Sequence, residues 1–279
     1  MFQTQNNQSG LDYHARVSWL MMGGLFTLRI PLTLWATMLY KPADQWARPV
    51  MAIGTYFLTA LLIWWEREQL EYFHITKLAL GIMILGKPIE ILLYYLKIPY
   101  TNSDLSPIYL LYLPISIALG IAIFLYQPRR QNRVKISWTW IVISITIGLA
   151  LAVVSSLLIK TPNPPGKLIV FPSLSVWLLG PIQQMSYAGI TEEPFFRGFL
   201  WGSLRKAGWN EGWIWLFQVA LFQIAHLYFI QLAPISFWIS IPLGGLVLGY
   251  VTWRSRSIAY SILAHGIGNG IGNILDNLV

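Results

Sequence analysis

Long apolar runs, each of about 20 residues, alternate with short polar connections along most of the chain. Strict period-two alternation is absent, and the runs are too long for barrel strands. The pattern predicts an all-α, polytopic transmembrane helix bundle with about 8–9 spanning helices. The nine candidate runs cover roughly 17–39, 49–65, 75–96, 107–126, 139–159, 175–203, 212–230, 235–253 and 257–278. The second run is short enough for an interfacial helix, and prolines in the sixth are compatible with a re-entrant piece followed by a helix.

Composition supports a multi-pass protein of the cell membrane. Hydrophobic residues make up 56% of the chain and charged residues 11%, against roughly 25% charged residues in soluble proteins. The absence of cysteine excludes disulfides, thiolate catalysis and cysteine-zinc sites. The net charge of +8 does not indicate nucleic-acid binding, because the basic residues are scattered between apolar runs. The lipid bilayer is therefore the expected environment.

The connecting loops predict an orientation. The most basic loop, 127–137, contains Arg129, Arg130, Arg133 and Lys135, and such loops favour the cytoplasmic side. With nine spans, the same side receives most of the remaining loop lysines and arginines. The sequence therefore predicts a cytoplasmic N-terminus and an outward C-terminus.

The proline-rich segment 161–167 predicts a division into residues 1–173 and residues 174–279. The first part, N-terminal transmembrane helices, has few charges inside its apolar runs. These charges are Arg29, Lys77, Lys87 and Glu90. Lys87 and Glu90 are three residues apart, so they would face each other on a helix and form an internal ion pair.

The second part contains an acidic cluster inside an apolar run. Glu193 and Arg197 are four residues apart and share a helix face, whereas Glu192 lies about 100° round the helix. Pro194 removes a backbone hydrogen bond at the same place. Glu193 is therefore expected to pair with Arg197, and Glu192 is left to face another group. A salt-bridge network at a helix end is the alternative interpretation.

His226 and His265 lie in later apolar runs, and Asn269 follows His265 by one helical turn. Glycines around His265 favour close helix packing but do not account for the histidine and asparagine. Counting about 1.5 Å per residue from the interfacial tryptophans and arginines puts Glu192, His226 and His265 at comparable depths. We expect the three side chains to line one cavity that opens toward the cytoplasm.

These residue types suit hydrolysis of an acyl bond. A glutamate with a histidine can activate water, and a histidine with an asparagine can donate hydrogen bonds to an oxyanion. Other intramembrane protease chemistries lack their residues: there is no HExxH, no GxSxG, and Asp276 is the one aspartate in a predicted span. Two alternatives remain open: a transporter or ion-pathway protein that uses the buried glutamate and histidines, and a non-catalytic immunity or maturation factor.

Three motifs in this order, each on its own helix, resemble those of the CAAX protease and bacteriocin-processing (CPBP, or Abi) family, which includes the type II CAAX prenyl endopeptidases. The resemblance covers about 174–275. The motifs are EExxxR (Glu192, Glu193, Arg197), FxxxH (Phe222, His226) and HxxxN (His265, Asn269).

The resemblance implies an intramembrane endopeptidase of membrane-associated or lipidated peptides and proteins. Glu192 would activate water with help from His226, and His265 with Asn269 would hold the oxyanion. Glu193 and Arg197 would support them.

The family has also been interpreted as metalloproteases, for which the zinc ligands here would be Glu192, His226 and His265. We favour chemistry without a cofactor, because Asn269 suits an oxyanion better than a divalent cation.

Overall fold

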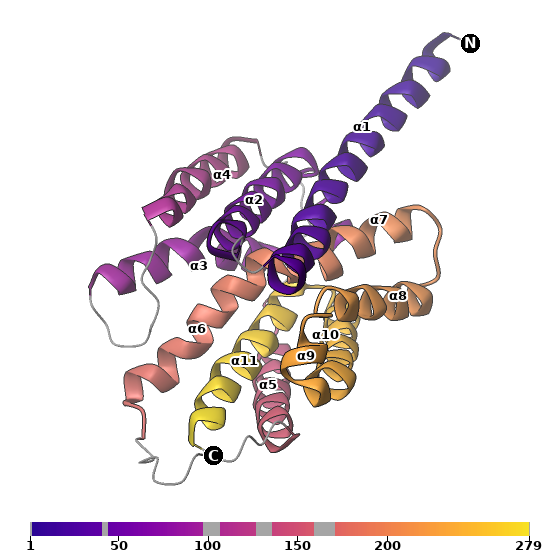
Figure 1. Cartoon of the computed structure of the whole chain (residues 1–279). Coiled ribbons are helices and arrows are strands. Elements are labelled where there is room, and N and C mark those ends of the chain that lie inside the picture. Colours follow the sequence, from indigo (N-terminus) through magenta and orange to yellow (C-terminus); the bar gives the residue numbers. More distant parts are fainter. Residues whose placement is uncertain (1, 41–43, 97–106, 127–135, 159–170, 279) are drawn as a thin grey trace.

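The computed structural model describes residues 2–40, 44–96, 107–126, 136–158 and 171–278. These residues form helices and no strand, which confirms the predicted all-α class. The helices are α1 (Phe2–Thr27), α2 (Asp44–Trp65), α3 (Lys77–Tyr95), α4 (Tyr112–Tyr126), α5 (Trp138–Leu158), α6 (Leu174–Thr191), α7 (Trp201–Lys206), α8 (Glu211–Ile224), α9 (Phe229–Leu232), α10 (Ile241–Ser255) and α11 (Ile258–Leu278). Figure 1 shows α1 extending beyond the bundle and α5, α6 and α11 side by side.

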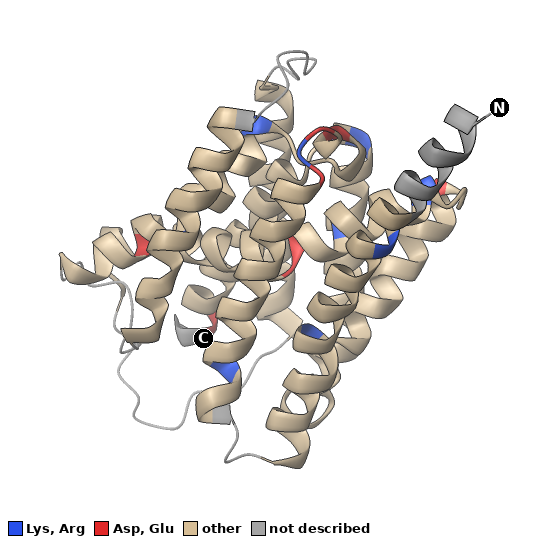
Figure 2. Cartoon of the chain, turned by 90° about the horizontal axis from the view of Figure 1, so that it is seen from above, with Lys and Arg blue, Asp and Glu red and all other residues tan. Residues whose placement is uncertain are grey.

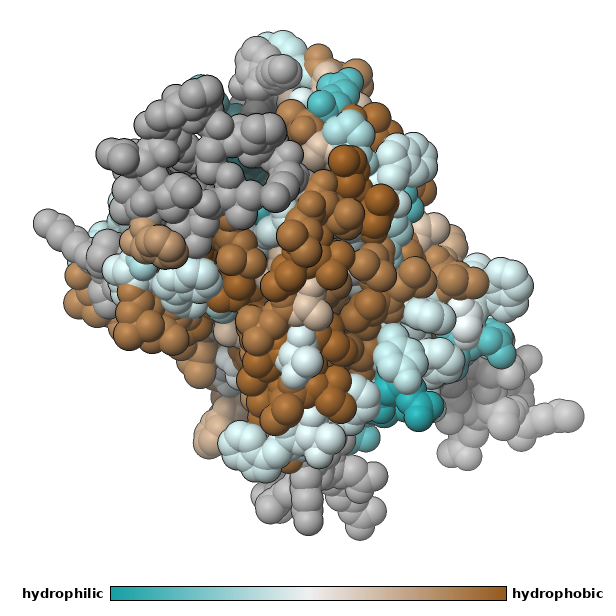
Figure 3. Space-filling view, turned by 90° about the horizontal axis from the view of Figure 1, so that it is seen from below, coloured by the Kyte–Doolittle hydropathy of each residue, from teal (hydrophilic) through white to brown (hydrophobic). Residues whose placement is uncertain are grey.

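Within the described residues, 6 helical segments are long and apolar enough to cross a membrane. They are Tyr13–Leu39, Gln45–Trp65, Lys77–Tyr95, Pro107–Leu125, Trp138–Leu158 and Ser236–Ser255. Large apolar side chains on these segments point away from the protein, and Phe124 is 87% exposed. Figure 3 shows a broad hydrophobic face of this kind. Such a surface is expected in lipid, and the chain is a membrane protein. A total of 8–9 spans stays a prediction.

Two predicted helices differ from the observed ones. The run 175–203 is interrupted at Glu192, where α6 has ended, and resumes as a π-helical segment, Pro194–Leu200, that leads into α7. The break falls next to Pro194, as its missing N–H predicts. The run 212–230 is shorter than expected, because α8 ends at Ile224. Its 14 residues span only about 21 Å, less than the roughly 30 Å hydrocarbon layer.

Helix α11 lies between α5 and α6, and its glycines make this possible. A Cβ atom on Gly270 would lie 2.5 Å from the backbone nitrogen of Pro181 in α6, and one on Gly266 would lie 2.7 Å from that of Met185. Gly268 and Gly272 face α5 instead. The alternate glycines therefore allow α11 to contact two helices at close range, which confirms the packing expected from the sequence.

Several loops meet at one end of the bundle. The hydroxyls of Thr76 and Ser257 are 2.7 Å apart, and the Ser137 amide donates to the Tyr260 hydroxyl over 2.8 Å. The starts of α3, α5 and α11 therefore share this end, as the alternation of spans predicted. Figure 2 shows how few charged residues the ribbon carries. The four basic residues of the loop used to predict orientation, all within 129–135, and the proline-rich segment 161–167 lie outside the described residues. The membrane orientation and the division at residue 173 therefore stay predictions.

A polar network closes this end, which we call the basic end. Arg205 pairs with Glu211 over 2.5 Å and contacts the Nε2 atom of His74 over 2.9 Å. His74 lies between the second and third spanning segments and is buried. Burial, together with the positive charges of Arg205 and Arg256, lowers the pKa of His74 to about 3. His74 is therefore neutral in the folded protein at neutral pH.

Candidate active site

Glu192 lies at the interruption between α6 and the π-helical segment. Its backbone dihedral angles, φ −128° and ψ −60°, are not helical, so its side chain leaves the face that Glu193 occupies. Glu193 is fully buried and pairs with Arg197 over 2.7 Å. The predicted division between the two glutamates is present: Glu193 has an internal partner, and Glu192 faces a different set of groups.

Two histidines approach Glu192 from separate segments. The Nε2 atom of His226 is 3.8 Å from one carboxylate oxygen, Oε1, and the Nε2 atom of His265 is 3.6 Å from the other, Oε2. His226 follows the end of α8 instead of lying within a helix. The prediction that it lies within an apolar helix was wrong, because the chain turns at residues 225–228.

The other nitrogen of each ring has its own partner. The Nδ1–H of His226 donates to the Phe222 carbonyl over 2.8 Å, and Nδ1 of His265 lies 2.8 Å from Oε1 of Glu193. A carbonyl can only accept, and a carboxylate accepts when ionised, so both Nδ1 atoms carry protons. These bonds direct both Nε2 atoms toward Glu192. Glu193 thus holds His265 as well as Arg197.

Sequence reasoning did not assign Arg29 to this site. Its guanidinium forms an ion pair with Oε1 of Glu192, and the Nη2 atom lies 3.5 Å from Nε2 of His226. The other terminal nitrogen, Nη1, donates to the Tyr187 hydroxyl over 3.3 Å. One signal is visible in the sequence, since Arg29 is a charge inside an apolar run. It could not identify the partner, which lies 163 positions later.

A cavity of about 420 Å³ adjoins the cluster, and Glu192, His226 and His265 all contribute to its wall. This confirms that one cavity brings the three together. Asn269 also lines it. The Asn269 side chain is exposed and has no hydrogen bond to any described residue. Its amide is therefore available to a molecule in the cavity.

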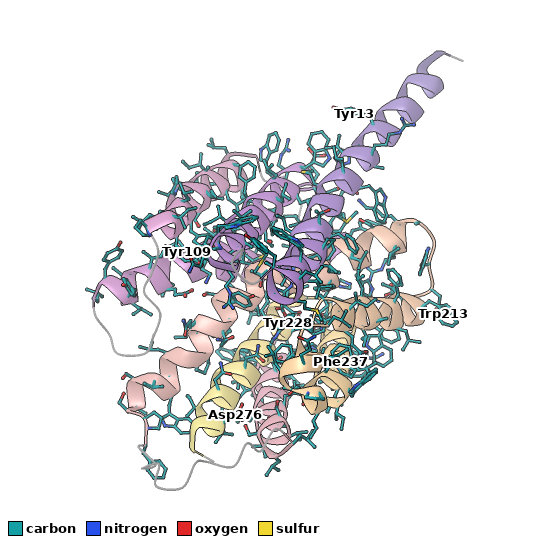
Figure 4. All side chains as sticks on the ribbon, viewed as in Figure 1. Tyr13, Tyr109, Trp213, Tyr228, Phe237 and Asp276 are labelled. Carbon is teal, nitrogen blue, oxygen red and sulfur yellow. The ribbon has the colours of Figure 1, made fainter. Side chains whose placement is uncertain are left out.

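The cavity follows α11 away from the basic end. Its wall continues from His265 through Asn269 and Asn273 to Asp276, near the end of α11, as Figure 4 shows for Asp276. With the predicted orientation, this direction is outward, which differs from the expected opening toward the cytoplasm. The physical reason is the early end of α8: short turns and α9 replace a full helix there and leave space. The depths of Glu192, His226 and His265 that the sequence predicts do not indicate toward which side of the membrane the cavity extends.

The alternative zinc ligands do not fit a metal ion in this arrangement. Two histidines fixed through Nδ1 are usual for ligands. However, the Arg29 guanidinium pairs with Glu192 and lies against His226, so a cation already contacts two of the three donors. A divalent ion at this position would be repelled by that charge. Within the described residues, no group of three carboxylate or imidazole side chains is arranged to hold a metal ion.

The fold and the site define a helical membrane protein with a buried carboxylate and histidine cluster at the wall of a cavity. Comparison with known families gives a more specific result: residues 169–271 match the family model described as type II CAAX prenyl endopeptidase Rce1-like. This match confirms the resemblance carried by the three motifs and supports a CAAX-type intramembrane protease. Searches of curated proteins and of solved structures give no match.

Proposed function

We propose that the protein is an intramembrane endopeptidase that hydrolyses membrane-associated or lipidated peptides with a water molecule activated by Glu192. One observation carries the proposal. Glu192 lies at the cavity wall with one oxygen, Oε1, held by a cation, while Oε2 has no hydrogen-bond partner in the described part of the chain. A buried carboxylate oxygen without a partner is expensive unless it is used. A water molecule in the cavity would satisfy it.

The proposed reaction begins when Oε2 of Glu192 takes a proton from this water. The water oxygen then bonds to the carbonyl carbon of the scissile peptide, and the carbonyl oxygen becomes an oxyanion. Collapse of this intermediate breaks the carbon–nitrogen bond. The leaving amine takes the proton from Glu192, which regenerates the carboxylate. His226, with Nε2 near the same carboxylate, helps to orient the water.

His265 and Asn269 are the proposed donors to the oxyanion. The Asn269 amide lines the cavity and has no hydrogen bond to any residue that the structure describes. Because Nδ1 of His265 is held by Glu193, its Nε2 can donate only when the ring carries two protons. Its two ring nitrogens lie 2.8 Å from Oε1 of Glu193 and 3.6 Å from Oε2 of Glu192. Removal of one oxyanion donor typically costs about 10²–10³ in kcat.

The test is peptide cleavage by purified protein reconstituted in liposomes, with candidate membrane peptides as substrates. Glu192→Gln keeps the shape of the side chain but removes the base, so we expect a loss of about 10²–10⁴-fold in rate. Asn269→Ala should lower kcat without lowering the melting temperature, because the side chain is exposed and has no bond to lose. Full activity in Glu192→Gln would contradict the proposal. A chelator control addresses zinc: loss of activity on chelation with rescue by zinc would contradict the metal-free mechanism.

A further inference from the structure

Arg29 connects the N-terminal part of the chain to the candidate base. It lies in the spanning segment Tyr13–Leu39, far outside the matched residues 169–271. Its side chain is 3% exposed, and its ion pair with Glu192 joins two buried charges. A buried cation in a membrane segment is costly, and a merely structural ion pair could be replaced by apolar side chains at little cost. The position of this charge at the reacting carboxylate therefore needs an explanation.

The local backbone explains how the side chain reaches the site. Pro31 lies inside the π-helical turn Leu28–Leu32 that follows α1. Proline lacks an N–H and opens the helical hydrogen bonding, and π-helical turns are frequent at functional sites. Tyr187 in α6 then holds the guanidinium from the other side through its hydroxyl. Arg29 is thus fixed by two groups, of which one is Glu192.

Arg29 acts on one oxygen of the carboxylate only. It holds Oε1, whereas Oε2 has no hydrogen-bond partner among the described residues and lies on the side of His265. Arg29 itself is not part of the cavity wall, whereas its partners Glu192, His226 and Tyr187 are, so it can act on a substrate only through these groups. We infer that Arg29 is a positioning residue, which fixes the Glu192 carboxylate at the cavity wall with Oε2 on the side of His265 and keeps the carboxylate ionised inside the membrane. This inference rests on the proposed hydrolysis.

The opposite role can be separated by experiment. Because Nη2 of Arg29 contacts both Oε1 of Glu192 and Nε2 of His226, the same contact could instead block the base. A blocking contact predicts that removal of Arg29 raises the rate. A positioning contact predicts that removal lowers it, since a displacement of about 1 Å in a catalytic group can cost about 10²-fold.

The first readout is the pH dependence of kcat for peptide cleavage. Arg29→Gln should lower kcat by about 10²-fold and move the acidic limb of the rate profile to higher pH, because the uncompensated carboxylate is protonated more easily. Arg29→Lys keeps the charge but not the two-sided geometry, so its acidic limb should stay closer to that of the unaltered protein. Arg67→Gln is the matched control: Arg67 lies at the basic end, bonded to the Trp64 carbonyl, and should leave the profile unchanged.

The second readout is a thermal double-mutant cycle, which needs no substrate. Arg29→Gln and Glu192→Gln should each lower the melting temperature by on the order of 10 °C, because each leaves one buried charge unpaired. The double variant should recover most of this loss. Additive losses would overturn the pairing, and wild-type kcat or a raised kcat in Arg29→Gln would overturn the positioning role. Failure of the proposed function looks different, since Glu192→Gln would then match the unaltered protein in every cleavage assay.

Discussion

Replacement of Arg197 by methionine tests whether the second buried pair stabilises the site. Arg197 and Glu193 are both fully buried, 2.7 Å apart, and the guanidinium lies 4.6 Å from the centre of the Phe222 ring. Removing one partner of a buried pair costs about 3–5 kcal/mol, because the other charge stays buried. Glu193 keeps its contact with His265, so we expect the lower value, about 3 kcal/mol. For a chain of this size, that corresponds to about 6–12 °C in melting temperature.

The assay is thermal unfolding in detergent, followed by intrinsic fluorescence from the 14 tryptophans. The double variant Glu193→Gln with Arg197→Met removes both charges, while the glutamine oxygen still accepts from Nδ1 of His265. It should melt at least about 4 °C above the single Arg197→Met variant, since a neutral pair avoids the unpaired buried charge. A single variant as stable as the unaltered protein would refute the reasoning. Equal melting of the single and double variants would refute it as well.

Two further predictions concern packing and pH. Gly270→Ala should fail to give a folded protein, because the new Cβ would lie 2.5 Å from the Pro181 backbone. Gly268→Ala, with its nearest contact at 3.5 Å, should fold normally in the same expression and gel-filtration assay. Equal behaviour of the two variants would contradict the close approach of α11 to α6. The unfolded-state pKa of His74, about 6.5, exceeds the folded value of about 3, so the unfolded chain binds more protons and stability is lost as pH falls below about 6.5. By pH 5 the loss in the free energy of unfolding attributable to His74 is about 2 kcal/mol. The melting temperature of His74→Gln should therefore change less between pH 7 and pH 5 than that of the unaltered protein. The same pH dependence in both proteins would contradict this prediction.

The helical class and the pairing within the acidic motif could be read from the sequence because both depend on local spacing. Apolar runs of spanning length predict helices. Residues four apart share a helix face, which predicts the observed pair of Glu193 with Arg197. Lys87 and Glu90, which are three residues apart, also share a helix face and pair, with 2.6 Å between Nζ and Oε2. Ser186 also bonds to Glu90 from α6, and that contact between distant segments has no local signal.

The features that sequence reasoning missed depend on where helices end and how they cross. Apolar composition continues past Ile224, so periodicity could not show that α8 stops there and that His226 lies in a turn. The direction of the cavity follows from the same early end. Arg29 was recognised as an unusual charge, but its partner is set by the packing of the N-terminal segment against the site. No spacing rule covers such a contact.

The buried charges of the site balance only when both parts of the chain are present. Glu192 and Glu193 contribute two negative charges, and Arg197 compensates one of them. The second cation, Arg29, comes from residues 1–173. Without it, the helices from 174 onward would hold an uncompensated carboxylate at membrane depth, at a cost of several kcal/mol. The predicted boundary near residue 173 therefore separates two stretches of sequence whose buried charges compensate each other, because Arg29 from the N-terminal helices pairs with Glu192.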